Sequence, residues 1–337
     1  MDLALTIFWI LVTMAGIIAA CEAFTNSIEW LGKKLNLSEG AVGSVLAAVG
    51  TALPETIIPI IAIVGAWYAG QTSGAEIGLG AIVGAPFMLS TLALFVTGAA
   101  ITIFVRQGRR DEHVRIDAGV MKRDLRFFLI TYASVVLASF IPNHLVKVLI
   151  GFVLIGIYGF YVYQTLQQPG ELGEEMGPLY FARGKEVPGL GIVLVQVAAS
   201  LVGIMVGAHF FVHQVAHLSS ALNINPLILS LVVTPIATEL PEKFNSVLWV
   251  RVKKDTLALG NITGAMVFQS CIPVAVGLWM TPWVLGRDTL FSAGLALVSA
   301  ALLYAEVHRR DGVTPFTLML GGLFYAVFLV GIFVFKI

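Results

Sequence analysis

Apolar runs of about 20 residues follow one another along almost the whole of this 337-residue chain. Hydrophobic residues make up 58% of the sequence and charged residues only 12%, roughly half the charged share of an average soluble domain. The runs are continuous rather than alternating, which argues against a membrane β-barrel. The sequence therefore predicts an all-α polytopic membrane protein that is embedded in a lipid bilayer. The formal net charge is zero, and no basic segment interleaved with aromatic residues indicates a nucleic-acid partner.

Ten membrane spans can be drawn from the apolar pattern. They cover residues 3–32, 39–68, 74–104, 124–142, 145–165, 189–219, 224–250, 255–281, 289–307 and 314–336. Residues 166–188 contain several glutamates, glycines and prolines, so we expect a linker there. This linker separates two halves of five helices each, residues 1–165 and residues 189–337.

Basic residues gather in or beside the connectors that follow spans 1, 3, 5, 7 and 9. The exceptions among the 20 lysines and arginines are Lys147, Lys243, Arg287 and Lys336. By the positive-inside rule these connectors are cytoplasmic, and both termini are predicted to lie outside. The basic loop 105–123 is expected to be a solvated topology signal, with contact to anionic lipid headgroups as the alternative. The compact chain shows no organelle-targeting or lipidation signal, which favours a prokaryotic plasma membrane.

Two short stretches inside these apolar runs carry the same residues in the same order. Gly50-Thr-Ala-Leu-Pro-Glu55 and Ala237-Thr-Glu-Leu-Pro-Glu242 share their threonine, leucine, proline and glutamate. Glu55 is the one formal charge between Ala41 and Trp67, and a carboxylate at such depth usually has a function. The proline before each glutamate removes a helical hydrogen bond and crowds a carbonyl one turn back. Two acids and loosened carbonyls together indicate a cation site.

The two stretches belong to an internal repeat. A shift of 187 positions places Gly16 on Gly203, Asn36 on Asn223 and Thr51 on Thr238, together with the Leu-Pro-Glu triplets. A shift of 180 positions places Gly80, Ile82, Gly84, Ala85 and Ser90 on Gly260, Ile262, Gly264, Ala265 and Ser270. Each half has an odd number of spans, so the second copy enters the membrane from the opposite side. We therefore expect inverted repeats with broken helices at the midplane, a recurrent plan of transporters.

At these motifs the chain resembles the cation/calcium antiporter superfamily, and the sodium/calcium exchanger group in particular. That family has two α-repeats, which correspond here to residues 39–104 and 224–281. Each contains a Gly-Thr-Ser-Leu-Pro-Glu-type motif, followed on the next helix by a Gly-Asn-x-x-Gly-Ser-Asn-type motif. The second motifs correspond here to Gly80-Ala-Ile-Val-Gly-Ala-Pro86 and Gly260-Asn-Ile-Thr-Gly-Ala-Met266.

The resemblance implies an antiporter that exchanges Ca²⁺ or a similar divalent cation for Na⁺ by alternating access. It implies no enzyme activity and no cofactor, and its partners are inorganic cations. The implied cation ligands are the carboxylates of Glu55 and Glu242, the hydroxyls of Thr51 and Thr238, and the carbonyls of Ala48 and Pro235. Calcium binds about 6–8 oxygens in flexible geometry, and two bidentate carboxylates with carbonyls from both breaks supply roughly six.

The sequence also departs from the family pattern. Alanine stands at positions 52, 85 and 265, where the family carries serines, and Leu89 replaces an amide or acid whose counterpart in the second repeat is Gln269. Several side-chain oxygens expected at sodium sites are therefore missing. This keeps open the alternative of a divalent cation/proton antiporter, in which H⁺ is the counter-ion.

Other polar residues in the spans leave alternatives open. Glu239 is either a third ligand or one half of a neutralised pair with Lys243, four residues on. Asn261 and Gln269 either line the site or bond across helices. His209, His213 and His217 share one helix face, which is expected to line the moving interface or its water path rather than to bind a metal. Trp30 and Trp249, near span ends, are expected to be interfacial anchors.

Two further function classes fit the sequence less well. An intramembrane metalloenzyme built on His209 and His213 would lack an acid within the histidine motif and would leave the Leu-Pro-Glu repeat unexplained. A passive cation channel commonly builds its filter from rings around a continuous pore, whereas inverted halves suit a single midplane site. The sequence leaves the counter-ion, the stoichiometry and the oligomeric state open.

Overall fold

The computed structural model describes residues 3–53, 55–57, 59–60, 63–64, 73–168, 177–221 and 240–335. Over these residues the chain is helical and contains no β-strand. Seven helices in this part of the chain are long and apolar enough to cross a membrane. The prediction of an all-α polytopic membrane protein is therefore confirmed.

The first half contains the elements α1 to α8. The first span is α1 (Leu3–Lys34), and the second begins with α2 (Glu39–Ala41), η1 (Val42–Ala47) and α3 (Ala48–Thr51). The third span runs through α5 (Ser73–Met88), η2 (Leu89–Ala93) and α6 (Leu94–Arg106), followed by α7 (Ala118–Ala138) and α8 (His144–Leu166). Both η1 and η2 are π-helical, a wider winding that is frequent at functional sites.

The second half repeats this order. A short 3₁₀ turn, η3 (Tyr180–Ala182), precedes α9 (Leu190–Ala221). The next described elements are α12 (Leu240–Arg251), α13 (Asp255–Met280), α14 (Arg287–Arg310), α15 (Pro315–Val330) and the π-helical η5 (Gly331–Phe335). Local sequence fixes several of these helix starts. Thr314, for example, accepts a hydrogen bond from the backbone of Thr317, and Pro315 follows in the first turn of α15.

Helices at equivalent places in the two halves run in opposite directions. In three such pairs the end of one helix, or the loop beyond it, lies beside the start of its counterpart. The contacts are Asn26–Gln196 for α1 and α9, Arg110–Asp255 for α6 and α13, and Lys122–Asp311 for α7 and α14. These contacts also bring basic connectors from both halves to one side of the molecule. The antiparallel pairing is the arrangement that inverted repeats require.

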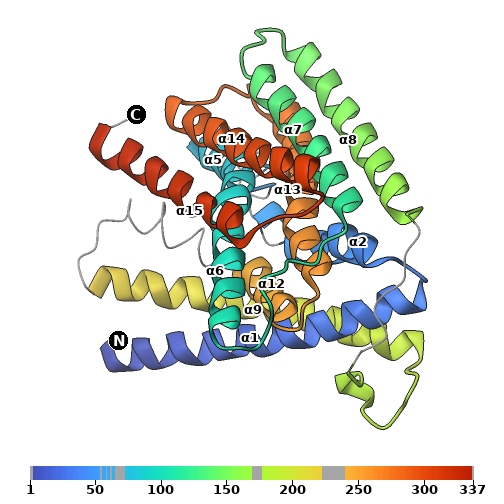
Figure 1. Ribbon diagram of the computed structural model, residues 1–337. Coiled ribbons are helices and arrows are strands. Elements are labelled where there is room, and N and C mark those ends of the chain that lie inside the picture. Colours follow the sequence, from blue (N-terminus) through green and yellow to red (C-terminus); the bar gives the residue numbers. More distant parts are fainter. Residues whose placement is uncertain are drawn as a thin grey trace.

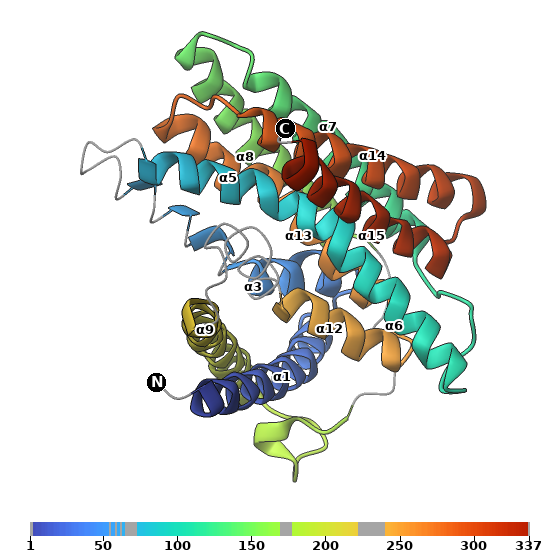
Figure 2. The same cartoon turned by 90° about the vertical axis from the view of Figure 1, so that its left-hand side faces the viewer.

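The helices form two layers. α1 and α9 lie side by side along most of their length, below the other helices in Figure 1 and again apart from them in Figure 2. α13 passes through the middle of the larger layer. In its most apolar 18-residue stretch 83% of the residues are buried, against 17% in α1 and 22% in α9. α13 is therefore the core helix, and the α1/α9 layer keeps most of its surface free for lipid.

Most helix bounds match the spans expected from the sequence, and α7 is the clearest departure. Its span was expected at 124–142, but the helix is Ala118–Ala138, with Asp117 as its N-cap. The charged residues of its first turns resemble a connector, although Asp124 is in fact fully buried. Two other expectations were wrong because they also assumed that polar side chains lie at the surface. Arg110 of the presumed solvated loop is buried, and so are the presumed anchors Trp30 and Trp249, since each has a polar partner from another segment.

Candidate functional site

Both central glutamates are buried. Glu55 lies just beyond α3 with a relative exposure of 9%, and Glu242 lies in the first turn of α12 with an exposure of 0%. Thr51 and Ala48, on α3, are also fully buried. A carboxylate removed from water to this degree needs a compensating charge or hydrogen bonds. Each of the two glutamates therefore lies where a carboxylate needs such a partner.

Thr51 joins the first half of the chain to the second. The single proton of its Oγ1 is shared between two acceptors, the carbonyl of Ala47 (3.1 Å) and Oδ1 of Asn261 on α13 (3.2 Å). The other end of the same amide, Nδ2 of Asn261, donates to the backbone carbonyl of Glu242 at 3.5 Å. Asn261 therefore connects the threonine of one Leu-Pro-Glu motif with the glutamate of the other.

Close packing of the second span against α13 makes this contact possible. A Cβ atom on Gly264 would lie 2.1 Å from the carbonyl oxygen of Ser44, and one on Gly43 would lie 2.9 Å from the carbonyl oxygen of Leu257. Glycine lets the two backbones approach as small residues do at other membrane helix interfaces. Gly43 of the second span and Gly264 of the second-repeat motif thus set the distance between the two halves here.

Asp124 is buried next to the contact between the second span and α13, and it bonds to both. Its Oδ2 accepts hydrogen bonds from Ser44 of η1 (2.6 Å) and from Thr263 of α13 (2.9 Å). Its Oδ1 accepts one from the hydroxyl of Tyr161 (3.1 Å) and forms an ion pair with Arg123 (2.9 Å). The carboxylate thereby fixes the second span on α13. Sequence reasoning missed it, because an acid next to three basic residues looks like part of a connector.

Two buried amides near the site lack hydrogen-bond partners among the residues that the structure describes. They are the side chains of Gln269 on α13 and Asn245 on α12, with relative exposures of 1% and 0%. Asn261, Ala265 and Gln269 follow one another at intervals of four, so they lie on one face of α13. Buried amides are normally satisfied by protein or ordered water. Gln269 could equally offer its oxygen to water or to a hydrated cation.

Other predicted site residues lie outside the described part of the chain. They are Pro235, Thr238 and Glu239, and the same holds for the side chains of His213 and His217. His209 is exposed on α9, and its ring packs edge-on against Phe210 at a centroid distance of 5.9 Å. Lys243, the possible partner of Glu239, is buried on α12. The backbone carbonyl of Ala48 accepts a hydrogen bond from Ala52 at 3.1 Å, which leaves its second lone pair for a ligand.

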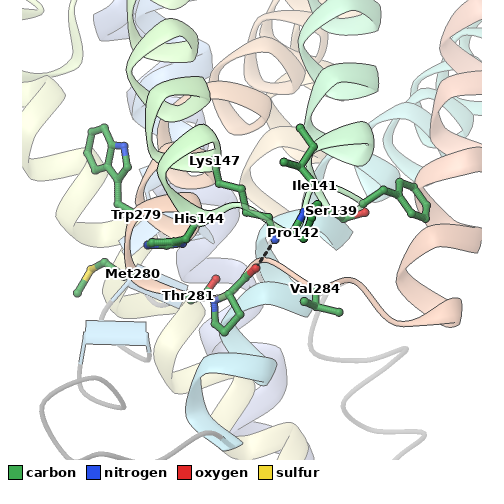
Figure 3. A pocket seen from close by; sticks show the side chains of 11 residues that line it. Ser139, Ile141, Pro142, His144, Lys147, Trp279, Met280, Thr281 and Val284 are labelled. Atoms are coloured by element: carbon green, nitrogen blue, oxygen red, sulfur yellow. Dashed lines mark hydrogen bonds between the residues drawn. The ribbon is translucent and has the colours of Figure 1, made fainter.

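A cavity of about 540 Å³ lies elsewhere, between the α7–α8 turn and the α13–α14 connector (Figure 3). Its charged residue, Lys147, points to the carbonyl of Pro282 and also donates to that of Trp283 at 3.2 Å. The ammonium group of Lys147 is thus hydrogen-bonded to two backbone carbonyls of the α13–α14 connector. The cavity does not include either central glutamate, so it is not part of the candidate cation site.

An all-helical bundle whose equivalent helices run in opposite directions in the two halves is a plan typical of membrane transporters. Residues 5–167 and 192–336 match the family described as "Sodium/calcium exchanger protein". The chain therefore belongs to the sodium/calcium exchanger family, and it is a cation antiporter rather than an enzyme.

Relatives and solved structures agree with this assignment. The chain is 24% identical over 334 residues to a putative antiporter, CaxA, of Alkalimonas amylolytica, a match that covers 96% of this chain and 98% of that protein. It is also 24% identical over 295 residues to an uncharacterized membrane protein, MJ0091, of Methanocaldococcus jannaschii, covering 86% and 87%. Among solved structures, the sodium-calcium exchanger NCX_Mj soaked with zero Na⁺ and Ca²⁺ superimposes with a TM-score of 0.77. That match has 18% identity and covers 98% of this chain and 100% of the other.

Proposed function

We propose that the protein exchanges Ca²⁺, or a similar divalent cation, for Na⁺ by alternating access at a site made by Glu55 and Glu242. The observation that carries the proposal is the pair of hydrogen bonds made by the side chain of Asn261. This amide contacts Thr51 of one motif and the backbone of Glu242 of the other. Glu55 follows Thr51 by four residues in the chain, and both glutamates are buried. Two negative charges would neutralise one divalent ion, and the same pair would hold monovalent ions when the divalent ion has left.

The remaining oxygens of the proposed site come from both motifs. The hydroxyls of Thr51 and Thr238 and the carbonyls of Ala48 and Pro235 would complete the coordination shell, with Asn261 and Gln269 as lining residues. Calcium accepts a variable number of oxygen ligands in flexible geometry, so a coordination shell of mixed carbonyl and carboxylate oxygens suits it. We place the basic connectors in the cytoplasm and both termini outside, on the positive-inside rule.

Exchange in proteoliposomes tests the carboxylates. Vesicles loaded with Na⁺ are diluted into calcium-containing buffer, and uptake is followed with an enclosed calcium dye. Glu55→Gln and Glu242→Gln should each abolish uptake while the protein still elutes as a monodisperse peak. The matched control is Glu306→Gln, an acid at the end of α14 with a side-chain exposure of 11% that bonds to Thr314. Normal uptake by either site variant would refute the assignment.

Proton coupling is the second candidate, and one observation favours it. Alanine at positions 52, 85 and 265 replaces serines of the family motifs, so hydroxyls expected at sodium sites are missing. Ala52 and Ala265 are fully buried. The loss of neutral oxygens weakens the binding of Na⁺, whereas it affects the protonation of a carboxylate less. A counter-transport panel distinguishes the two candidates by testing Ca²⁺, Mn²⁺ and Mg²⁺ against Na⁺ and H⁺ gradients. Calcium uptake driven by a pH gradient in Na⁺-free buffer would establish H⁺ as the counter-ion.

A further inference from the structure

A second cavity lies on the side of the basic connectors, between the end of α1 and the segment that leads into α9. It has a volume of about 420 Å³ and is lined by Trp30, Lys33, Pro178, Arg183, Gly184, Lys185 and Glu186. Three cationic side chains face one carboxylate in this lining, so the cavity is net positive. Its volume is within the range of about 300–1,000 Å³ that small-molecule sites occupy.

Hydrogen bonds to α1 and α9 hold the wall of this cavity in place. The indole of Trp30 donates to the carbonyl of Gly177 (3.0 Å), and Asn26 both donates to the carbonyl of Pro178 (3.3 Å) and accepts from the backbone of Tyr180 (3.2 Å). Gln196 of α9 accepts from the backbone of Phe181 at 2.9 Å. The segment from Gly177 to Phe181 is therefore fastened to both helices of the smaller layer, beside the end of α1 that Figure 1 draws in lighter blue.

Aromatic rings orient two of the cations. The ammonium of Lys33 lies 5.6 Å from the ring centroid of Trp30, and the guanidinium of Arg183 lies 5.3 Å from that of Tyr180. A cation held over a ring face keeps its N–H groups available for an anion. Lys33, Arg183 and Lys185 are exposed, so they can reach a ligand that enters from outside.

Exposed apolar side chains lie close in the chain to the residues that line this cavity. Phe181, Val187 and Leu190 have relative exposures of 52%, 68% and 45%, and Leu35 just beyond α1 has 49%. These residues follow or precede membrane spans, so they lie at the level where acyl chains meet headgroups. A basic cavity with an apolar rim at this level suits a molecule with an anionic head and a hydrocarbon tail, and a soluble anion would make no use of the rim.

We propose that this cavity binds the phosphate headgroup of an anionic phospholipid from the leaflet on the basic side. Lys33, Arg183 and Lys185 contact the phosphate oxygens, and Phe181, Val187 and Leu190 contact the first part of the acyl chains. Basic pockets between helices on this side of a membrane are suited to anionic headgroups, and each lysine or arginine adds an increment of attraction. The site is separate from the two central glutamates and does not depend on which cations are exchanged.

Thermal stability of the full chain in lipid-free detergent tests the proposal. Dioleoyl phosphatidylglycerol, dioleoyl phosphatidylcholine and inorganic phosphate are titrated separately. The expected result is a rise in Tm of about 5 °C with saturating phosphatidylglycerol, reduced by salt, and none with the other two probes. An equal rise with phosphatidylcholine would refute the charge recognition. An equal rise with inorganic phosphate would show an anion site that does not recognise lipid, which would also overturn the proposal.

Two triple variants locate the effect. In Lys33→Gln/Arg183→Gln/Lys185→Gln we expect half-maximal stabilisation to need at least about tenfold more phosphatidylglycerol. The control Arg106→Gln/Arg109→Gln/Arg309→Gln removes the same charge from exposed residues on the same side that do not line the cavity. It should respond like the unmodified protein, and an equal loss in both variants would show bulk electrostatics and refute the site. If the pocket triple does not fold, Lys33→Gln and Lys185→Gln are measured singly against Arg109→Gln, and the same comparison decides.

Discussion

Oγ1 of Thr51 donates a hydrogen bond of 3.2 Å to Oδ1 of Asn261, and this bond joins the two repeats at the place where the buried glutamates lie. The two residues are 210 positions apart in the chain. The same amide also donates to the backbone carbonyl of Glu242, so Thr51 and the second motif share one partner. The proposed site should therefore depend on contacts between the halves as well as on the two acids.

Removal of this bond should weaken cation binding. Thr51→Val keeps the shape of the side chain but removes the hydroxyl that bonds to Asn261 and is a proposed ligand. Loss of one such bond is worth about 1 kcal/mol, so the apparent affinity for Ca²⁺ should fall at least roughly fivefold in the proteoliposome assay. Thr97→Val is the matched control, since Thr97 is also buried and bonds to the carbonyl four residues earlier (2.9 Å), but on α6. Unchanged affinity in Thr51→Val would show that the hydroxyl is not used.

The close approach of α13 to the second span gives a second prediction. In Gly264→Ala the new methyl group would lie 2.1 Å from a backbone oxygen of Ser44, so the helices must separate. Overpacking of this kind destabilises by about 1–3 kcal/mol, and the separation also pulls Asn261 away from Thr51. We expect a lower Tm together with impaired exchange. Gly294→Ala on α14 meets no atom within 4 Å among the described residues, so it should leave Tm unchanged or raise it slightly.

The sequence contained enough information to predict the helices and the acids, but not the contacts between them. α13 was expected at 255–281 and is Asp255–Met280, because its apolar run is long and uninterrupted. The start of α7 was misjudged, because the partners that make a buried carboxylate acceptable at Asp124 come from η1, α8 and α13. A bond from Asn261 across helices was one of the two alternatives, but its partner Thr51 was beyond prediction for a related reason. Identifying the partner requires knowing how two helices are aligned with each other, and glycines determine that alignment. The pattern of apolar spans does not contain this information.

The buried ion pair between Arg110 and Asp255 should be a major source of stability. Both side chains have an exposure of 0%, and the guanidinium meets the two carboxylate oxygens at 2.7 Å each. Asp255→Asn leaves an arginine charge buried without its counter-charge, which typically costs about 3–5 kcal/mol. A large drop in Tm is therefore expected. Asp111→Asn breaks an exposed pair with Arg115 and should change Tm little, so equal effects of the two variants would contradict the prediction.

Acid should abolish the contribution of the surface pair between Lys122 and Asp311. The ammonium of Lys122 holds the pKa of the Asp311 carboxyl below its usual range. A carboxyl whose pKa is lowered on folding stabilises the protein above its unfolded pKa, and this stabilisation is lost as the pH falls through the folded pKa. The Tm of Asp311→Asn should thus lie slightly below that of the unmodified protein at neutral pH and converge with it in acid. Asn tolerates the left-handed backbone at this position (φ 51°), so strain does not confuse the comparison.

The ion pair between Glu29 and Lys254 connects the α1/α9 layer to the connector between α12 and α13. Glu29 also accepts a hydrogen bond of 2.8 Å from the indole of Trp249, so both of its carboxylate oxygens are engaged. In the proposed alternating-access cycle one layer moves against the other, and such a movement would have to break this contact at one end of α1. Removal of the pair should therefore change transport as well as stability.

A charge reversal can separate these two effects. Glu29→Lys and Lys254→Glu each place like charges together, and both should lower Tm and slow exchange. The double variant Glu29→Lys/Lys254→Glu restores the attraction, and we expect a coupling energy of about 1 kcal/mol or more in Tm-derived stability. Its exchange rate should recover only in part, because the bond from Trp249 to a carboxylate oxygen is lost. Strictly additive effects would show that the two side chains do not act as a pair.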